Sequence, residues 1–154
     1  MPSQTLKTTH QIQFVPHQHE LLVTLSVTGL PGPGPVRLAT PTWIPGAYGF
    51  MKYGRDVFNL EVREPDTGAV LVHRREGWSS FVVEAISPSL EVRYTVHAYD
   101  PAWGELAGFV DHQQALFLAT RCLYLPDFPG PCRVQFIVPE GWALHHPSGA
   151  TPLG

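Results

Sequence analysis

Proline and glycine interrupt the apolar runs of this chain so often that no long regular element fits between them. Sixteen prolines and fourteen glycines are spread over 154 residues. Between them, apolar and polar side chains alternate, most clearly at residues 20–27, where Leu21, Val23, Leu25 and Val27 share one face. A period of two residues is typical of strands, and proline and glycine mark the turns between them. The pattern predicts an all-β domain of many short strands.

The alternating runs predict eight to ten strands and little helix. They occupy residues 6–15, 20–27, 36–39, 57–63, 69–74, 78–85, 90–99, 115–120 and 133–138. We expect the first two runs to pair antiparallel, and hairpins to form across the turns at residues 65–68 and 87–89. The predicted fold class is an antiparallel β-sandwich. Periodicity fades after residue 139, so we expect one β domain at residues 1–144 and the start of a linker at residues 145–154.

Composition argues against several classes of protein. Hydrophobic residues make up 44% of the chain and charged residues 15%, which argues against disorder. The net charge is −3 and the basic residues are scattered, so we expect no nucleic-acid partner. The sequence has no apolar stretch of roughly eighteen residues and no signal-peptide pattern at its start, so we expect no membrane association and a cytoplasmic location. Cys122 and Cys132 do not form a Cys-x-x-Cys metal pair, and a disulfide across a hairpin is disfavoured in a cytoplasmic chain.

No catalytic motif is complete in this sequence. Residues 19–23 read His-Glu-Leu-Leu-Val, so Val23 replaces the second histidine of the zinc motif His-Glu-x-x-His, and the local pattern is that of a strand. His17 and His19 could project from one side of a strand, but a third metal ligand is missing nearby. Residues 77–81, Gly-Trp-Ser-Ser-Phe, lack the Gly-x-Ser-x-Gly elbow of serine hydrolases. We therefore expect no catalytic residue, metal or cofactor within this chain.

The irregular stretch at residues 101–111 holds a first group of candidate contact residues. Asp100, Glu105 and Asp111 lie in or beside it, and we interpret them as solvated loop residues rather than as an acid–base pair. Trp103 is the apolar residue most expected to be exposed there. An exposed tryptophan in such a loop marks a contact surface. Trp103 and Asp111 are therefore candidate substrate or domain contacts.

A proline-clamped corner at residues 41–48, Pro-Thr-Trp-Ile-Pro-Gly-Ala-Tyr, holds the second group. The prolines fix their own φ and keep the preceding residues extended, while Pro-Gly suits a type II turn. We expect Trp43 and Ile44 to anchor the incoming arm in a core. The corner is either a buried structural bend or, through outward aromatic side chains, a contact surface. Candidate contacts are Tyr48, Tyr53 and Arg55, with Arg55 expected to stack on a tyrosine and to pair with Asp56 or Glu61.

The order of these pieces resembles a known family. After the Pro-x-Trp-x-Pro-Gly-x-Tyr corner come Tyr-Gly-Arg at residues 53–55, Trp78 opening a strand, Val-Arg-Tyr-Thr-Val-His-Ala-Tyr-Asp at residues 92–100 and Val-Pro-Glu-Gly-Trp at residues 138–142. From about residue 9 to residue 144, the chain resembles the N-terminal domain of the glycyl-aminopeptidase-type zinc metallopeptidases. These are multidomain enzymes with a gluzincin catalytic domain and a PDZ domain.

The resemblance implies a curved β-saddle with no catalytic role of its own. It further implies that the linker leads to a separate catalytic domain, which holds the zinc and its His-Glu-x-x-His motif and hydrolyses peptides. This domain would pack on that catalytic domain and shape one wall of the substrate cleft. The residues give a second interpretation, a free-standing β-sandwich that binds peptide or carbohydrate through exposed aromatics. A lipocalin-like carrier is disfavoured because too few long strands are predicted to surround a ligand.

Overall fold

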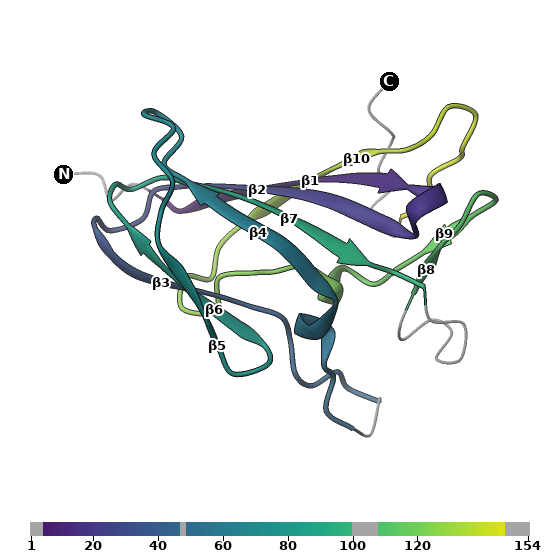
Figure 1. The fold of residues 1–154 in the computed structure, drawn as a ribbon, viewed down its shortest axis with the longest axis horizontal. Helices are drawn as coiled ribbons and strands as arrows, with labels where there is room; N and C mark the ends of the chain where they lie inside the picture. Colours follow the sequence, from purple (N-terminus) through teal and green to yellow (C-terminus); the bar gives the residue numbers. More distant parts are fainter. Residues whose placement is uncertain (1–4, 47–48, 100–107, 147–154) are drawn as a thin grey trace.

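The computed structural model describes residues 5–46, 49–99 and 108–146, which form an all-β fold with three short 3₁₀ turns (Figure 1). The strands are β1 (Lys7–Val15), β2 (Glu20–Thr28), β3 (Gly34–Ala39), β4 (Val57–Arg63), β5 (His73–Glu76), β6 (Ser80–Ala85), β7 (Leu90–His97), β8 (Phe109–Val110), β9 (Ala115–Leu116) and β10 (Cys132–Ile137). The 3₁₀ turns are η1 (Pro16–Gln18), η2 (Tyr53–Asp56) and η4 (Ala119–Arg121). The helical segments within these ranges are single short turns, and none could span a bilayer.

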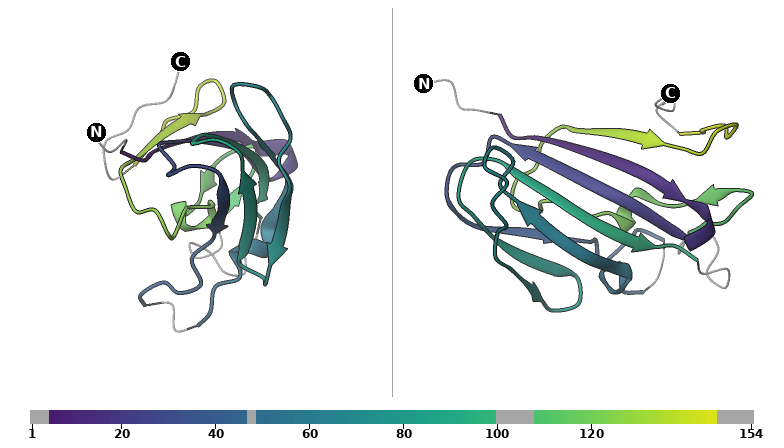
Figure 2. Two further views of the ribbon diagram at one scale, coloured as in Figure 1. Left: turned by 90° about the vertical axis from the view of Figure 1, so that its left-hand side faces the viewer. Right: turned by 45° about the horizontal axis from the view of Figure 1, so that its top comes forward.

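The strands form two layers and a small hairpin. The larger layer is a five-stranded sheet with the order β10-β1-β2-β7-β4, and the second layer has the order β3-β6-β5. Figure 2 shows the second layer lying below the five-stranded sheet, with the β8–β9 hairpin at one end. The predicted all-β sandwich, and the predicted antiparallel pairing of β1 with β2, are confirmed.

One described ladder departs from the predicted antiparallel pairing, because β10 runs parallel to β1. The chain reaches β10 through the second layer. Tyr124 forms an isolated bridge with Ala39 at the end of β3, and each backbone N–H donates to the other's carbonyl at 2.9 and 2.8 Å. The proline-rich loop at residues 126–131 then turns the chain onto the open edge of β1. Because the chain returns through the second layer, β10 starts at the end of the sheet where β1 also starts. The two strands therefore run in the same direction.

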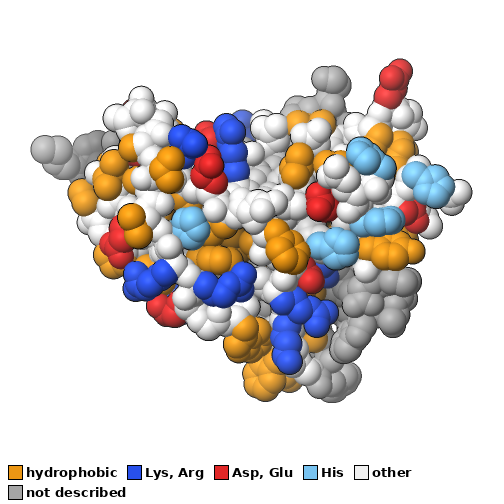
Figure 3. Space-filling view, viewed as in Figure 1, with side chains coloured by type: hydrophobic (Ala, Val, Ile, Leu, Met, Phe, Trp, Pro, Cys, Tyr) orange, Lys and Arg blue, Asp and Glu red, His pale blue; other side chains and the backbone are white. Residues whose placement is uncertain are grey.

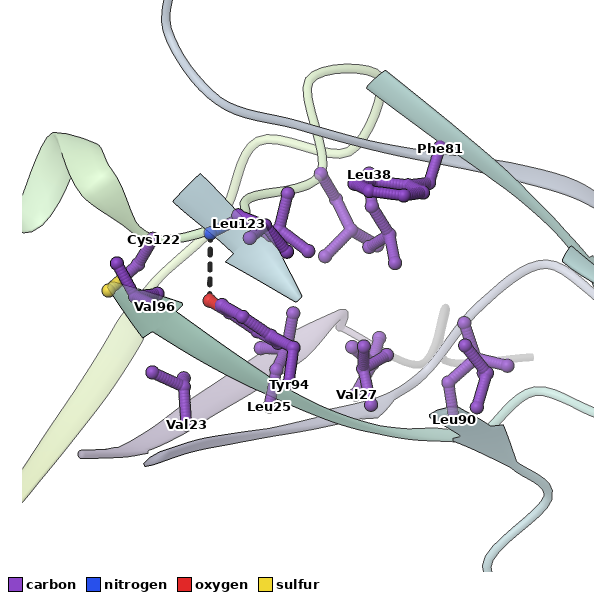
Figure 4. Packing of buried hydrophobic residues seen from close by; sticks show 14 of the residues in the cluster. Val23, Leu25, Val27, Leu38, Phe81, Leu90, Tyr94, Val96, Cys122 and Leu123 are labelled. Carbon is purple, nitrogen blue, oxygen red and sulfur yellow. Dashed lines mark hydrogen bonds between the residues drawn. The ribbon is translucent and has the colours of Figure 1, made fainter. Parts of the chain in front are cut away.

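The core lies between the inner faces of the two layers. Alternate residues of β1, β2 and β7 point into it and meet Val36, Leu38, Phe81 and Val83 from the second layer. Figure 4 shows Tyr94 of β7 crossing this space, where its hydroxyl accepts a hydrogen bond from the backbone N–H of Leu123 at 2.8 Å. Burial raises the pKa of the Tyr94 phenol well above its usual value. The phenol therefore stays protonated and ties the returning chain to the sheet.

Both predicted hairpins need correction. The turn at residues 65–68 forms, and beyond it Val70 bridges to Arg63 and the Leu71 N–H donates to the Val62 carbonyl at 2.8 Å. The hairpin ends there, because His73–Glu76 joins the second layer beside β6. Across the turn at residues 87–89, β6 and β7 do not pair, since β6 belongs to the second layer and β7 to the five-stranded sheet. Alternation identifies the buried face of a strand, but it does not say which strand lies alongside. Both turns therefore carry the chain from one layer to the other.

Three smaller predictions were also tested. The strand predicted at residues 115–120 shortens to β9, and η4 follows it. Residues 20–23 lie in β2, so the incomplete zinc motif is part of a strand, as its pattern indicated. Both cysteines are free, with Cys122 buried and Cys132 exposed. Burial raises the pKa of the Cys122 thiol to about 12, so this cysteine does not serve as a nucleophile at neutral pH.

Candidate functional site

The proline-clamped corner projects beyond both layers and carries two exposed aromatic rings (Figure 1). Trp43 is 55% exposed and Phe50 is 71% exposed. They form an isolated bridge, and their rings meet edge to face with centroids 5.9 Å apart. Gly46 has φ +88°, the conformation predicted for the third position of a type II turn. We call Trp43 and Phe50, with the turn between them, the aromatic corner.

The prediction that Trp43 anchors this segment in the core is wrong, and Ile44 is only half buried. The anchors are instead Met51 and Tyr53, both buried on the outgoing arm. The Met51 N–H donates to the Thr42 carbonyl at 2.8 Å, which closes the base of the corner. The corner lies outside the layers, so its tip has no core to enter. Trp43 and Phe50 are therefore left exposed to water.

A buried arginine fixes the base of the aromatic corner to the sandwich. Arg121 is 3% exposed, and its Nη2 donates to Asp56 Oδ2 at 3.0 Å and to the His97 carbonyl at 2.7 Å. Its guanidinium carbon lies 5.3 Å from the centroid of the Tyr53 ring. Arg121 thus joins η4, η2 and the end of β7 through one side chain. A charged group this deep is stable only when it is paired and hydrogen-bonded.

Gly54 allows η2 to lie against the second layer. A Cβ at this position would collide with the backbone carbonyl oxygen of Trp78, so a side chain cannot be accommodated. Arg75 adds a second tie, because its Nη1 donates to the Gly54 carbonyl at 3.3 Å. The direction of the corner is therefore set by close backbone packing as well as by Arg121.

The predicted contact residues are placed in three different ways. Tyr53 is buried under Arg121, so it supports the corner rather than facing outward. Arg55 is exposed, and its Nε lies 3.6 Å from Asp56 Oδ1, one of the two carboxylates predicted to pair with it; the other, Glu61, pairs with Arg63. Tyr48 and Trp103 lie outside the described residues, so their role as contacts remains a prediction.

Asp111 closes the β8–β9 hairpin instead of presenting a free carboxylate. Its Oδ1 accepts hydrogen bonds from the backbone N–H groups of Gln113 and Gln114 at 2.8 and 2.9 Å. These bonds lower the pKa of the Asp111 carboxyl. Asp100 and Glu105, the other two carboxylates of the predicted loop group, fall outside the described residues. The structure therefore gives Asp111 a local structural role.

His19 links the β1–β2 turn to the β8–β9 hairpin. Its Nδ1 lies 2.6 Å from the Val110 carbonyl oxygen, and its ring stacks at a tilt on Tyr99 with centroids 4.2 Å apart. The His17–His19 pair does not extend into a metal site. Within the described ranges, no three His, Cys, Asp or Glu side chains gather closely enough to hold an ion. The donors that the structure describes here thus do not make up a zinc ligand set.

Sequence reasoning missed Arg121, the residue that organises this end of the molecule. The available signal was a lone arginine inside the apolar run Leu-Phe-Leu-Ala-Thr-Arg-Cys-Leu-Tyr-Leu at residues 116–125. A charge within such a run needs a partner, and Asp56, sixty-five positions away, was not visible as that partner. What the described residues build here is an outward-facing aromatic pair above a buried arginine, and exposed apolar groups of this kind are typical of contact surfaces.

Comparison with known proteins assigns the fold to a family. The family model of the peptidase M61 N-terminal domain matches residues 9–152. Among solved structures, the chain is similar to an aminopeptidase N family protein from Idiomarina loihiensis, with a TM-score of 0.76 and 21% sequence identity over 86% of this chain. The chain spans 22% of the length of that protein, and at this identity the similarity shows a shared fold. The comparison with curated proteins gives no match. On the family match, which covers nearly the whole sequence, the chain belongs to the peptidase M61 N-terminal domain family.

Proposed function

We propose that this domain is a non-catalytic part of a zinc-dependent aminopeptidase, in which it packs on the catalytic domain and shapes one wall of the peptide cleft. Family membership supports the parent activity. The observation that carries the packing role is the exposed Trp43–Phe50 pair, held out from the sandwich by the Arg121–Asp56 anchor. Aromatic residues on a rigid support are typical hot spots of protein interfaces.

The zinc belongs, on this proposal, to a different domain of the same protein. The histidines and carboxylates described here do not gather into a ligand set. Zinc in a peptidase polarises the scissile carbonyl and activates a water molecule. The contribution of this chain is to bury the aromatic corner against its neighbour. On this proposal Arg55, which is exposed beside the corner, contributes to the same boundary, together with Tyr48 and Trp103 as predicted contacts.

The test uses the full-length protein with Trp43→Ser and Phe50→Ser combined. Both side chains are exposed, so the domain should fold normally, while kcat/KM for an aminoacyl substrate should fall at least about tenfold through the loss of an interfacial hot spot. The matched control combines Val70→Ser and Val72→Ser, which remove two exposed apolar side chains outside the corner. The control should keep wild-type kcat/KM.

Two results would contradict the proposal. One is unchanged kcat/KM and unchanged thermal unfolding of the full-length corner variant. The other is a gene whose reading frame stops at Gly154 without reaching a His-Glu-x-x-His motif, which would favour the free-standing binding module instead.

A further inference from the structure

The outer face of the five-stranded sheet carries a hollow that the proposed packing does not use. It has a volume of ≈ 260 Å³ and lies over β1, β2, β7 and β4. This is just below the range of about 300–1,000 Å³ typical of small-molecule sites. Figure 3 shows uncharged polar surface in the middle of this face, between a charged cluster and a group of histidines. The aromatic corner contributes no residue to the hollow.

Neutral hydrogen-bonding side chains from three strands line the hollow. Gln11 and Gln13 come from β1, Thr24 from β2 and Asn59 from β4. Among the described residues, these four side chains make no hydrogen bond to another protein group. Each amide offers both donors and an acceptor, and each hydroxyl offers both as well. The hollow therefore presents unused hydrogen-bonding capacity on a fixed sheet.

A bulge in β4 aims Asn59 at this hollow. The pairing of β4 with β7 shifts register between Phe58 and Glu61, so one extra residue is inserted on β4. Asn59 adopts φ +55°, a left-handed conformation that asparagine tolerates better than most residues. Bulges redirect side chains and are common beside binding sites. This departure from regular pairing distinguishes the hollow from the ordinary polar face of a sandwich.

The charge and apolar surroundings narrow the class of ligand. Arg93 is the one charged residue among those lining the hollow, and its Nε pairs with Glu91 at 2.9 Å, so the lining is close to neutral. Leu22 lines the hollow at 40% exposure, and Phe58, paired with Thr95 on the same face, is 50% exposed. A neutral lining disfavours phosphates and other strongly charged ligands. The combination suits a ligand with many hydroxyl groups and apolar C–H faces.

A peptide fits this position poorly. Peptides that bind sheets usually add a strand to an open edge, where backbone groups are free. The hollow lies mainly over β1, β2 and β7, which are inner strands with neighbours on both sides. Their backbone groups are already used in the ladders. We infer that this hollow is a binding site for a neutral oligosaccharide, held by the amides of Gln11, Gln13 and Asn59.

The test is calorimetric titration of the full-length protein with neutral tetrasaccharides built from glucose, mannose or N-acetylglucosamine, and with tetraglycine as the peptide probe. We expect at least one tetrasaccharide to bind at millimolar concentration. Asn59→Gly removes the amide and keeps the left-handed backbone, so it should weaken binding roughly fivefold without loss of stability, the effect of one or two lost hydrogen bonds. The double variant Gln11→Ala, Gln13→Ala should weaken binding at least as much.

The matched control is Ser26→Ala, an exposed residue on β2 outside the hollow, which should leave binding unchanged. The inference is overturned if no tetrasaccharide binds, if tetraglycine binds in preference, or if Asn59→Gly binds as tightly as wild type. Should the double glutamine variant fail to fold, Asn59→Gly alone decides. The outcome is independent of the peptidase proposal, since it concerns a different surface and a different measurement.

Discussion

Arg121 is the side chain on which the orientation of the aromatic corner most depends. It is almost fully buried, and its partners are Asp56 and the His97 carbonyl. In Arg121→Met, both partners would lose a charged donor, and we expect a loss of about 3 kcal/mol in the free energy of unfolding. Urea denaturation measures this loss. The control, Arg37→Met, breaks the exposed Arg37–Asp127 pair and should cost less than about 1 kcal/mol. Equal losses in the two variants would contradict the anchor role.

We expect His10 to make the stability of the fold sensitive to mild acid. It is buried on the core face of β1, and its Nδ1 has no hydrogen-bond partner among the residues that the structure describes. Burial lowers its pKa below the ordinary value of 6.5, so the folded state resists protonation while the unfolded state accepts it. Stability contributed by neutral His10 is therefore complete above pH 6.5 and is lost as the pH falls below that value towards the folded-state pKa.

We expect His10→Leu to reduce this loss of stability. The measurement is the change in urea midpoint between about pH 7.5 and about pH 5.5, which should be smaller in the variant than in wild type. The exposed His73 on β5 supplies the control, because His73→Gln should leave the wild-type change intact. If His10→Leu loses as much stability in acid as wild type does, His10 is not the cause of the acid sensitivity.

At the scale of single elements, the turn after β4 depends on one carboxylate. Glu64 is buried, and its Oε2 accepts from the N–H and the hydroxyl of Thr67, both at 2.7 Å, while its Oε1 accepts from the Ser87 hydroxyl at 3.1 Å. The hydrogen bonds from Thr67 are the main cause of its lowered pKa. The carboxylate thus joins the two turns that carry the chain between layers.

Glu64→Gln should destabilise the protein in a pH-dependent way. The folded-state pKa is lowered, so the stabilisation is present above the ordinary pKa of 4.5 and disappears as the pH falls through the folded-state value. The difference in urea midpoint between wild type and variant should therefore be largest at neutral pH and shrink in acid. The exposed Glu140 gives a control, Glu140→Gln, without effect at either pH. If the difference in urea midpoint between wild type and Glu64→Gln grew as the pH fell, the Glu64 carboxylate would not stabilise the fold in the way described.

The sequence predicted the positions of the strands better than it predicted which strands pair with each other. The β1–β2 pair was predictable because a short turn joins two runs whose alternation agrees. The β6–β7 hairpin was not, because two buried runs joined by a short turn look alike whether they pair or face each other across a core. In the corner, proline and glycine located the turn correctly. Whether Trp43 points into a core depends on the layers around it, which local sequence does not contain.

At the scale of the whole molecule, the two surfaces for which we propose a function lie on separate parts of the fold. The aromatic corner projects beyond the two layers (Figure 1), and the polar hollow lies on the outer face of the larger sheet. Family membership accounts for the fold. The proposed packing uses the corner, and the proposed saccharide site uses the sheet face, so the two proposals do not compete for one surface.

The parallel contact between β1 and β10 has a mechanical consequence. β1 precedes every other described strand and β10 follows them all, and their register runs from Thr8 beside Cys132 to Gln13 beside Ile137. Tension that pulls the start of β1 away from the end of β10 would act along both strands. Every rung of that ladder would then bear load in shear at the same moment, instead of opening one after another. Stretched from its two ends inside a larger protein, the domain would behave as a stiff link and give way only after more flexible segments had extended.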